Sequence, residues 1–233
     1  MNKKFELISG KLLLFYFLII YLAFQAHEVG HWIFSFLFNL DFVVMPSEVI
    51  IPTPGEPWQE IIILAMGTIF SALIAILGIF LLYKSKNIFW RRTGYFIGFF
   101  SCVGMIGYYI AGTFQLIPVD ATGIAFYLQI PQHYLTIPTI VFFIFLLIII
   151  VKNTQTGYRN FKYSLLFFVL LVIERIMIVF LFNPFLKSLW EEGHIVAQPI
   201  LNFPTILLII NLVSIILFSY LLIKRDSLLI PFS

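Results

Sequence analysis

Charge is scarce in this sequence: Asp, Glu, Lys and Arg occupy 11% of its 233 positions, whereas hydrophobic residues occupy 61%. Ordinary soluble domains carry about 25% charged residues, so the composition excludes that class and predicts an integral membrane protein embedded in the lipid bilayer. The single cysteine, Cys102, excludes an intrachain disulfide. The net charge is only +3, and the basic residues stand in short clusters between apolar runs. We therefore expect no nucleic-acid partner.

Long apolar runs predict six membrane-spanning helices. A hydrocarbon core is crossed by about 17 to 25 predominantly apolar residues, and runs of this kind recur along the whole chain. They cover residues 12–38, 61–83, 94–117, 135–151, 164–186 and 203–223. The predicted fold class is an all-α polytopic membrane protein, with residues 1–233 forming a single membrane domain.

The basic residues predict the orientation of these helices. If the spans alternate, one side of the membrane receives Lys3, Lys4, Lys11, Lys84, Lys86, Arg91, Arg92, Lys152, Arg159, Lys162, Lys224 and Arg225. The connections on the other side hold Asp41, Glu48, Glu56, Glu60, Asp120, Glu191 and Glu192, with Lys187 as their basic residue. Because cytoplasmic connections are enriched in Lys and Arg, we expect both termini in the cytoplasm and the protein in the cell membrane.

Two of the outer connections differ from plain loops. Residues 41–60 alternate β-branched residues with Pro and Gly, which predicts extended or hairpin structure held against the helices. Residues 116–134 include the helix-breaking Pro118 near their start.

The segment "AHEVGH" places two histidines and a glutamate, side chains common in metal sites, inside the first apolar run. His27 and His31 are four residues apart, so on an α-helix they project from one face at a spacing that suits two ligands of one metal ion. In H-E-x-x-H sites the glutamate, here Glu28, is a general base that takes a proton from the water activated by the metal. An ionisable residue within a span costs about 2.5–3.5 kcal/mol, which favours a functional interpretation over chance.

A catalytic zinc normally has three protein ligands and one open position, so another segment is expected to supply the third ligand. Asp120 is the preferred candidate, because Pro118 is expected to end the third helix and to let the aspartate turn inward. The alternative for Asp120 is a solvated loop carboxylate. The other candidates on the outer half are His133, Glu174, Glu191, Glu192 and His194.

These motifs resemble those of the site-2 protease family of intramembrane zinc metalloproteases. Members carry H-E-x-x-H on the first of three core helices and an N-x-x-P-x-x-x-L-D-G type motif near the third. His27, Glu28 and His31 match the first motif, and Asp120 would match the aspartate ligand. The resemblance covers residues 12–125 and implies a three-helix catalytic core there, with three additional transmembrane helices in residues 135–223.

The chain also departs from the family pattern. Gln115 stands for the asparagine, Ala121 replaces the glycine, and the segment between Pro118 and Asp120 is contracted. On the middle helix, Ser71 replaces the asparagine of the G-P-x-x-N element. In typical members the first core helix enters from outside, whereas the charge distribution here predicts that this helix runs from inside to outside.

Small residues predict close helix packing in this core. Gly67, Ser71 and Ala75 recur every four residues on the second helix, and Gly94 and Gly98 do so on the third. This spacing lets helices approach closely in lipid, although it is common in membrane helices generally.

The sequence thus predicts an intramembrane zinc endopeptidase that hydrolyses a peptide bond in or near a transmembrane segment of a membrane-protein substrate. Its Zn²⁺ would be held by His27, His31 and Asp120, with Glu28 as the catalytic base. Two alternatives stay open: a catalytically silent zinc-binding protein of the same fold, and a transporter. Glu174 and Arg175, midway along the fifth run, are expected to form structural ion pairs with other helices.

Overall fold

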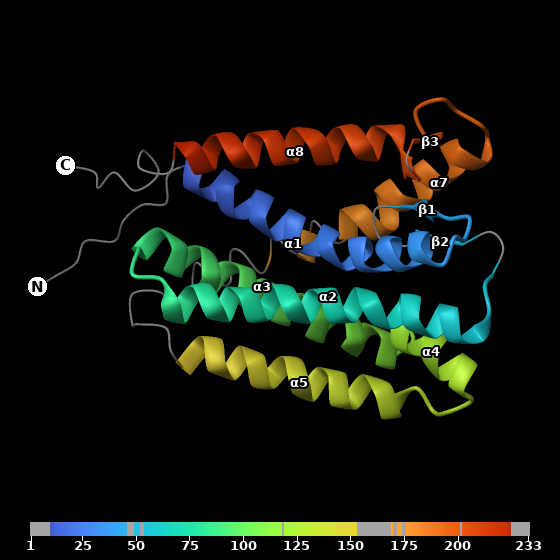
Figure 1. The fold of residues 1–233 in the computed structure, drawn as a ribbon, viewed down its shortest axis with the longest axis horizontal. Coiled ribbons are helices and arrows are strands. Elements are labelled where there is room, and N and C mark those ends of the chain that lie inside the picture. The colour runs from blue at the N-terminus through green and yellow to red at the C-terminus, as the bar shows by residue number, and fades with distance from the viewer. Residues whose placement is uncertain are drawn as a thin grey trace, which may run out of the picture.

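The computed structural model describes residues 10–45, 49–51, 54–117, 119–152, 169, 172–173, 176–200 and 202–224. The described chain is mostly helical, and its long helices lie side by side (Figure 1). The helices are α1 (Gly10–Leu37), α2 (Pro57–Lys84), α3 (Ile88–Thr113), α4 (Asp120–Leu128), α5 (His133–Lys152), the π-helix η2 (Ile178–Phe182), α7 (Asn183–Glu191) and α8 (Thr205–Ile223).

Four helices in the described residues are long and apolar enough to cross a membrane: α2, α3 from Phe89, α5 and α8. The protein is thus a membrane protein by composition and helix length, but only four of the six predicted spans are confirmed. Helix α1 has 28 residues and carries Gln25, His27, Glu28 and His31 in one stretch. Parts of the predicted span 164–186 lie outside the described residues, Glu174 and Arg175 among them; its last residues belong to η2 and α7.

Two short antiparallel ribbons modify the all-α prediction. Strands β1 (Val43–Val44) and β2 (Val49–Ile50) pair within the segment 41–60, as the sequence predicted. Strands β3 (Pro199–Ile200) and β4 (Phe203–Pro204) form a second ribbon ahead of α8. The ribbons are joined where the Val44 N–H donates to the Asn202 carbonyl over 2.8 Å. Together they cover one end of the helix bundle (Figure 1).

Glycines allow α1, α2 and α3 to cross at short distance, as the small-residue spacing predicted. A Cβ on Gly30 of α1 would lie 2.5 Å from the Met66 carbonyl oxygen of α2. A Cβ on Gly78 of α2 would lie 2.6 Å from the Gly98 Cα and 2.7 Å from the Gly94 carbonyl oxygen of α3. Since real Cβ atoms do not tolerate these distances, glycine at these positions is what permits both backbone contacts.

The end of α3 is determined by a local backbone motif. Gln115 adopts a left-handed conformation with φ +57°. The Gln115 N–H donates to the Gly112 carbonyl over 2.9 Å, and the Leu116 N–H donates to the Ala111 carbonyl over 2.9 Å. This is the Schellman pattern of helix termination, and it ends α3 at Thr113. Pro118, which the sequence suggested as the helix breaker, lies outside the described residues.

Helix α4 occupies the connection that follows, for which the sequence predicted a helix break at Pro118 but no helix. It runs back along α2 in the opposite direction: Asp120 hydrogen-bonds to Thr68, and Gly123, one turn further along α4, packs on the Leu64 side chain. The N-cap residue Val119 provides no side-chain hydrogen bond to α4. The placement of α4 brings its first residue, Asp120, into the bundle.

The two ends of the bundle differ in charge. Helix α1 begins, and α5 and α8 end, at the end where α2 is followed by α3 (Figure 1). At this end α2 and α5 terminate in Lys84 and Lys152. The ribbons, α4 and α7 lie at the opposite end (Figure 1), which carries Glu56, Glu191 and Glu192. The described helices α1, α2, α3 and α5 alternate in direction (Figure 1); alternation across all six spans, and the side of the membrane that each end faces, remain predictions.

Candidate metal centre

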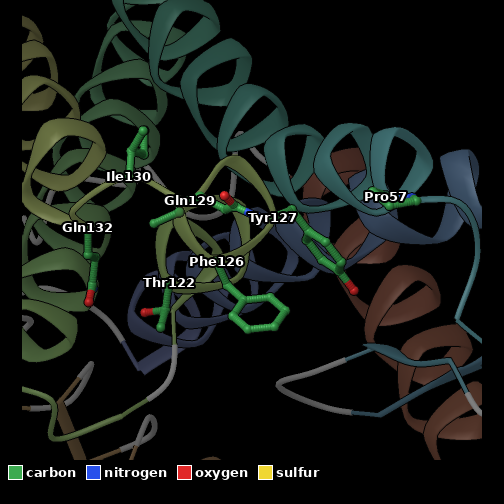
Figure 2. Close-up of a pocket in the computed structure, with 8 residues that line it drawn as sticks. Pro57, Thr122, Phe126, Tyr127, Gln129, Ile130 and Gln132 are labelled. Carbon is green, nitrogen blue, oxygen red and sulfur yellow. The ribbon is translucent and has the colours of Figure 1, made fainter.

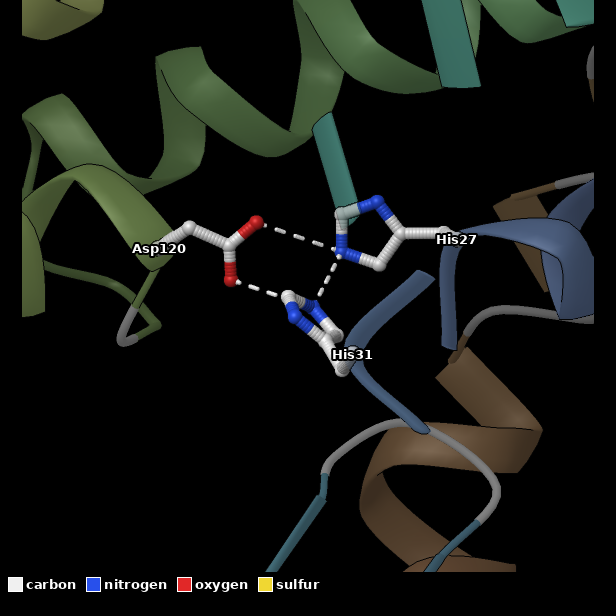
Figure 3. A group of neighbouring side chains, drawn as sticks. All are labelled: His27, His31 and Asp120. Atoms are coloured by element: carbon white, nitrogen blue, oxygen red, sulfur yellow. Dashed lines mark hydrogen bonds and ion pairs between the residues drawn. The ribbon is translucent and has the colours of Figure 1, made fainter. Parts of the chain in front are cut away.

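His27, His31 and Asp120 converge inside the bundle, although 89 positions of sequence separate His31 from Asp120. Figure 3 shows the two imidazoles of α1 facing the carboxylate at the start of α4. The Nε2 atoms of His27 and His31 are 3.2 Å apart. Asp120 Oδ2 lies 3.3 Å from His27 Nε2, and Asp120 Oδ1 lies 3.5 Å from His31 Nε2. All three residues are buried, with exposed fractions of 5 to 8%.

Helix α2 fixes the orientation of both imidazoles through their other ring nitrogens. His31 Nδ1 lies 2.7 Å from the Ile63 carbonyl oxygen. A carbonyl only accepts hydrogen bonds, so Nδ1 carries the proton and Nε2 of the neutral ring keeps its lone pair for the centre. His27 Nδ1 lies 3.1 Å from Ser71 Oγ, which can accept a hydrogen bond from the ring N–H in the same way. Hydrogen bonds of this type are typical of metal-binding histidines.

Gly67 provides the space in which the two imidazoles lie. A Cβ at Gly67 would clash with the His31 ring at Nε2 and Cε1 and would lie 2.9 Å from His27 Cε1. The rings are nearly perpendicular to each other, with an interplanar angle of 85°. Gly67 was predicted as a packing residue, and the structure shows that what packs on it is the pair of histidines themselves.

The three donor groups lie close enough to share one metal ion. The two Nε2 atoms are 3.2 Å apart, and each faces a different oxygen of Asp120, at 3.3 and 3.5 Å. With one donor atom taken per residue, all three lie within 4.8 Å of one another. Donor atoms of a tetrahedral zinc lie about 3.3–3.4 Å apart, so the group could hold a metal ion after a small adjustment of the carboxylate. Two imidazoles and one carboxylate form a typical ligand set of catalytic zinc, and three ligands leave the fourth position open.

Asp120 is surrounded by hydroxyl groups as well as by histidines. Thr68 of α2 donates to Asp120 Oδ2 over 3.3 Å, and Tyr108 of α3 donates to Asp120 Oδ1 over 3.4 Å. Hydrogen bonds donated to a carboxyl group favour its ionised form, and the carboxylate is the form that binds metal.

Glu28 lies next to His27 on α1 and is also buried, with 5% of its surface exposed. A buried carboxyl group in a membrane helix is costly, which agrees with a function for this residue. Its role as the base stays a prediction from the motif.

The other ligand candidates that the structure describes do not join the centre. His133 begins α5 and lines a separate cavity of about 340 Å³ with Thr113 and Thr136. His194 is exposed and pairs with Glu192, with 3.4 Å between His194 Nε2 and Glu192 Oε2. Among the described residues, His27, His31 and Asp120 are the one group of at least three His, Cys, Asp or Glu side chains placed to share a metal ion. Glu174 lies outside the described residues.

A larger cavity of about 660 Å³ lies along α4. Figure 2 shows Thr122, Phe126 and Gln132 among the residues that line it, and Pro57 at the start of α2. Neither the histidines nor Asp120 line this cavity. It is therefore separate from the centre, although both are built on α4.

Three residues of the site were missed in the sequence: Thr68, Tyr108 and Tyr109. Thr68 follows Gly67, and the two tyrosines occur in an aromatic-rich helix with no motif around them. Their proximity to Asp120 depends on how α2, α3 and α4 pack, so no local spacing could have revealed it. The hydroxyl groups of Thr68 and Tyr109 are themselves hydrogen-bonded to each other.

Comparison of the chain with protein-family models, with curated proteins and with solved structures found no match. The resemblance to site-2 proteases therefore remains a prediction that rests on the motif residues. The functional argument rests on the geometry of the centre.

Proposed function

We propose that the protein is an intramembrane zinc metalloendopeptidase that cleaves a peptide bond in or near a transmembrane segment of another membrane protein. One observation carries this proposal: two imidazole Nε2 atoms and one carboxylate, close enough to share a metal ion, lie buried in an apolar bundle, and the buried Glu28 directly follows His27 on α1. The ligand set, the open fourth position and an adjacent carboxyl base are the parts that zinc-dependent peptide hydrolysis requires.

Each residue has a distinct role in this proposal. His27, His31 and Asp120 would hold the zinc, which when bound polarises the scissile carbonyl and lowers the pKa of a water molecule to about 7. Glu28 takes the proton of the attacking water and delivers it to the leaving amine. Ser71 and the Ile63 carbonyl hold the two imidazoles with Nε2 directed at the centre. Burial keeps bulk water from competing for these groups.

The substrate must be locally unwound, because a spanning helix hides its peptide bonds in its own hydrogen-bond ladder. The β1–β2 ribbon offers backbone groups to which an unwound segment could add as a strand. Since the Val44 N–H of β1 already donates to Asn202, we place the added strand at β2. The partner is thus a membrane protein or a membrane-embedded peptide.

The test combines metal analysis with a cleavage assay. Purified full-length protein in detergent is expected to contain about one equivalent of zinc and to cleave a membrane-embedded peptide. Removal of zinc with a chelator should abolish cleavage, and adding zinc back should restore it. Zinc without cleavage of any transmembrane peptide would favour the silent zinc-binding alternative, and the absence of both would contradict the metal centre.

A further inference from the structure

The carboxylate of Asp120 makes a symmetrical set of contacts. Each oxygen faces one imidazole and one hydroxyl group: Oδ2 faces His27 Nε2 and Thr68 Oγ1, and Oδ1 faces His31 Nε2 and the Tyr108 hydroxyl. The imidazoles come from α1 and the hydroxyl groups from α2 and α3, whereas Asp120 belongs to α4. Helices α1, α2 and α3 therefore together determine the orientation of the Asp120 side chain.

The direction of the hydrogen bonds follows from the acceptor. An ionised carboxylate only accepts, so Thr68 must donate its proton to Asp120 Oδ2. The oxygen of Thr68 is then free to accept from the Tyr109 hydroxyl, with which it is hydrogen-bonded. Tyr109 thus acts on Asp120 through Thr68, in the order Tyr109, Thr68, Asp120.

Tyr108 makes a second contact with the same residue. Its hydroxyl oxygen accepts the backbone N–H of Asp120 over 3.2 Å while its proton points to Asp120 Oδ1. The first N–H groups of a helix have no partner within that helix, and the N-cap residue Val119 gives α4 no side-chain bond. Tyr108 supplies the missing acceptor, so this hydroxyl holds both the backbone and the side chain of Asp120.

We propose that Thr68, Tyr108 and Tyr109 form a hydroxyl clamp that positions Asp120 as the third metal ligand. This inference rests on the metal centre of the proposed function, and it assigns the clamp residues a positioning role without metal contact. By engaging both carboxylate oxygens, the clamp fixes the side-chain rotamer and limits Asp120 to binding the ion through one oxygen. Partners of this kind typically change metal affinity 10- to 100-fold when removed.

The test measures zinc affinity in the full-length protein by competition with a chromogenic chelator. Thr68→Val and Tyr108→Phe remove one hydroxyl each and are expected to weaken zinc binding about 10- to 100-fold. Thr68→Ser keeps the hydroxyl and should restore wild-type affinity. Tyr109→Phe should have a smaller effect, and Thr68→Val combined with Tyr109→Phe should be no worse than Thr68→Val alone. Thr139→Val and Tyr83→Phe, which lie outside the centre, are the matched controls.

Cobalt substitution gives a readout that a general loss of stability would not produce. Four-coordinate Co²⁺ absorbs visible light more strongly than five-coordinate Co²⁺, so a second bound oxygen of Asp120 in Thr68→Val should lower the absorption. Wild-type zinc affinity and an unchanged cobalt spectrum in both Thr68→Val and Tyr108→Phe would overturn the clamp while leaving the metal centre intact. Failure of the wild type to bind zinc would overturn both. If Thr68→Val does not fold, Tyr108→Phe and Tyr109→Phe decide the question.

Discussion

At the scale of single residues, His27 and Glu28 are neighbours with different tasks in the proposed mechanism. Glu28→Gln is expected to retain zinc, because glutamine is nearly isosteric and neither imidazole changes. Its cleavage rate should fall about 10²- to 10⁴-fold, since the amide cannot accept or deliver the proton. Zinc content and cleavage of a membrane-embedded peptide are measured on the same preparation.

His27→Ala provides the comparison for this variant, because it removes a ligand and should lose metal and activity together. A Glu28→Gln protein that cleaved at the wild-type rate would contradict the protease mechanism and favour the silent zinc-binding fold.

Asp120 is the ligand whose assignment depends most on the fold. Asp120→Ala should lower zinc affinity and cleavage together, because two imidazoles alone bind zinc weakly. His133→Ala and His194→Ala are suitable controls, since both side chains lie away from the centre. Their zinc content should stay near one equivalent. Full zinc occupancy in Asp120→Ala would remove this residue from the ligand set.

At the scale of helices and strands, the contact between α1 and α2 determines whether the histidines reach their positions. Gly67→Ala should reduce zinc binding and lower stability by about 1–3 kcal/mol, because the added methyl group enters the space of both imidazoles. Gly107→Ala is the matched control, since nothing lies within 4 Å of a Cβ there. Thermal unfolding and zinc content should both separate the two variants. Equal behaviour of the two would show that the rings have room to move.

The β1–β2 ribbon is the element to test for substrate binding. Val44 donates away from β2, so its antiparallel partner Val49 directs its own N–H away from β1, toward the free edge of β2. Val49→Pro removes this donor and should reduce cleavage of a membrane-embedded substrate with little change in zinc content. Val49→Ile, which keeps the backbone donor, should behave like the wild type. Undiminished cleavage by Val49→Pro would exclude strand addition at β2.

The sequence allowed prediction of those features that depend on local spacing. His27 and His31 share a helix face because they are four residues apart, and the close packing of α2 and α3 followed from small residues such as Gly94. The segment 41–60 was correctly predicted to hold strands, because its β-branched residues alternate with turn residues. Each of these signals lies within one turn or one short segment of the chain.

Features that depend on tertiary contacts could not be predicted in this way. The sequence suggested that Pro118 ends the third helix, whereas the left-handed conformation of Gln115 and its hydrogen bonds end α3 at Thr113. Helix α4 was missed because it is short and gains its stability by packing against α2. Tyr108 and Thr68 reach Asp120 only after three helices have packed, so their roles have no local signal in the sequence.

At the scale of the whole molecule, the sorting of charge between the two ends predicts the orientation in the membrane. Cysteines introduced at exposed positions Glu56 and His194 should react with an impermeant thiol reagent added outside intact cells. A cysteine at Lys86, close to Arg91 at the basic end, should react only after the membrane is disrupted. The native Cys102 is fully buried and should contribute little background. The reverse labelling pattern would overturn the predicted orientation and agree with the usual site-2 protease arrangement.

The order of the proposed ligands along the chain has a consequence for biosynthesis. His27 and His31 are translated early, on α1, whereas Asp120 follows only after α2 and α3. A nascent chain that stops within α3 carries both imidazoles and Glu28 but lacks the carboxylate that completes the ligand set. Zinc can therefore be fully bound only once three helices have been inserted and α4 has folded against α2. The proposed protease would thus be inactive during the insertion of its first three helices, and neighbouring nascent membrane proteins would be protected from it during that time.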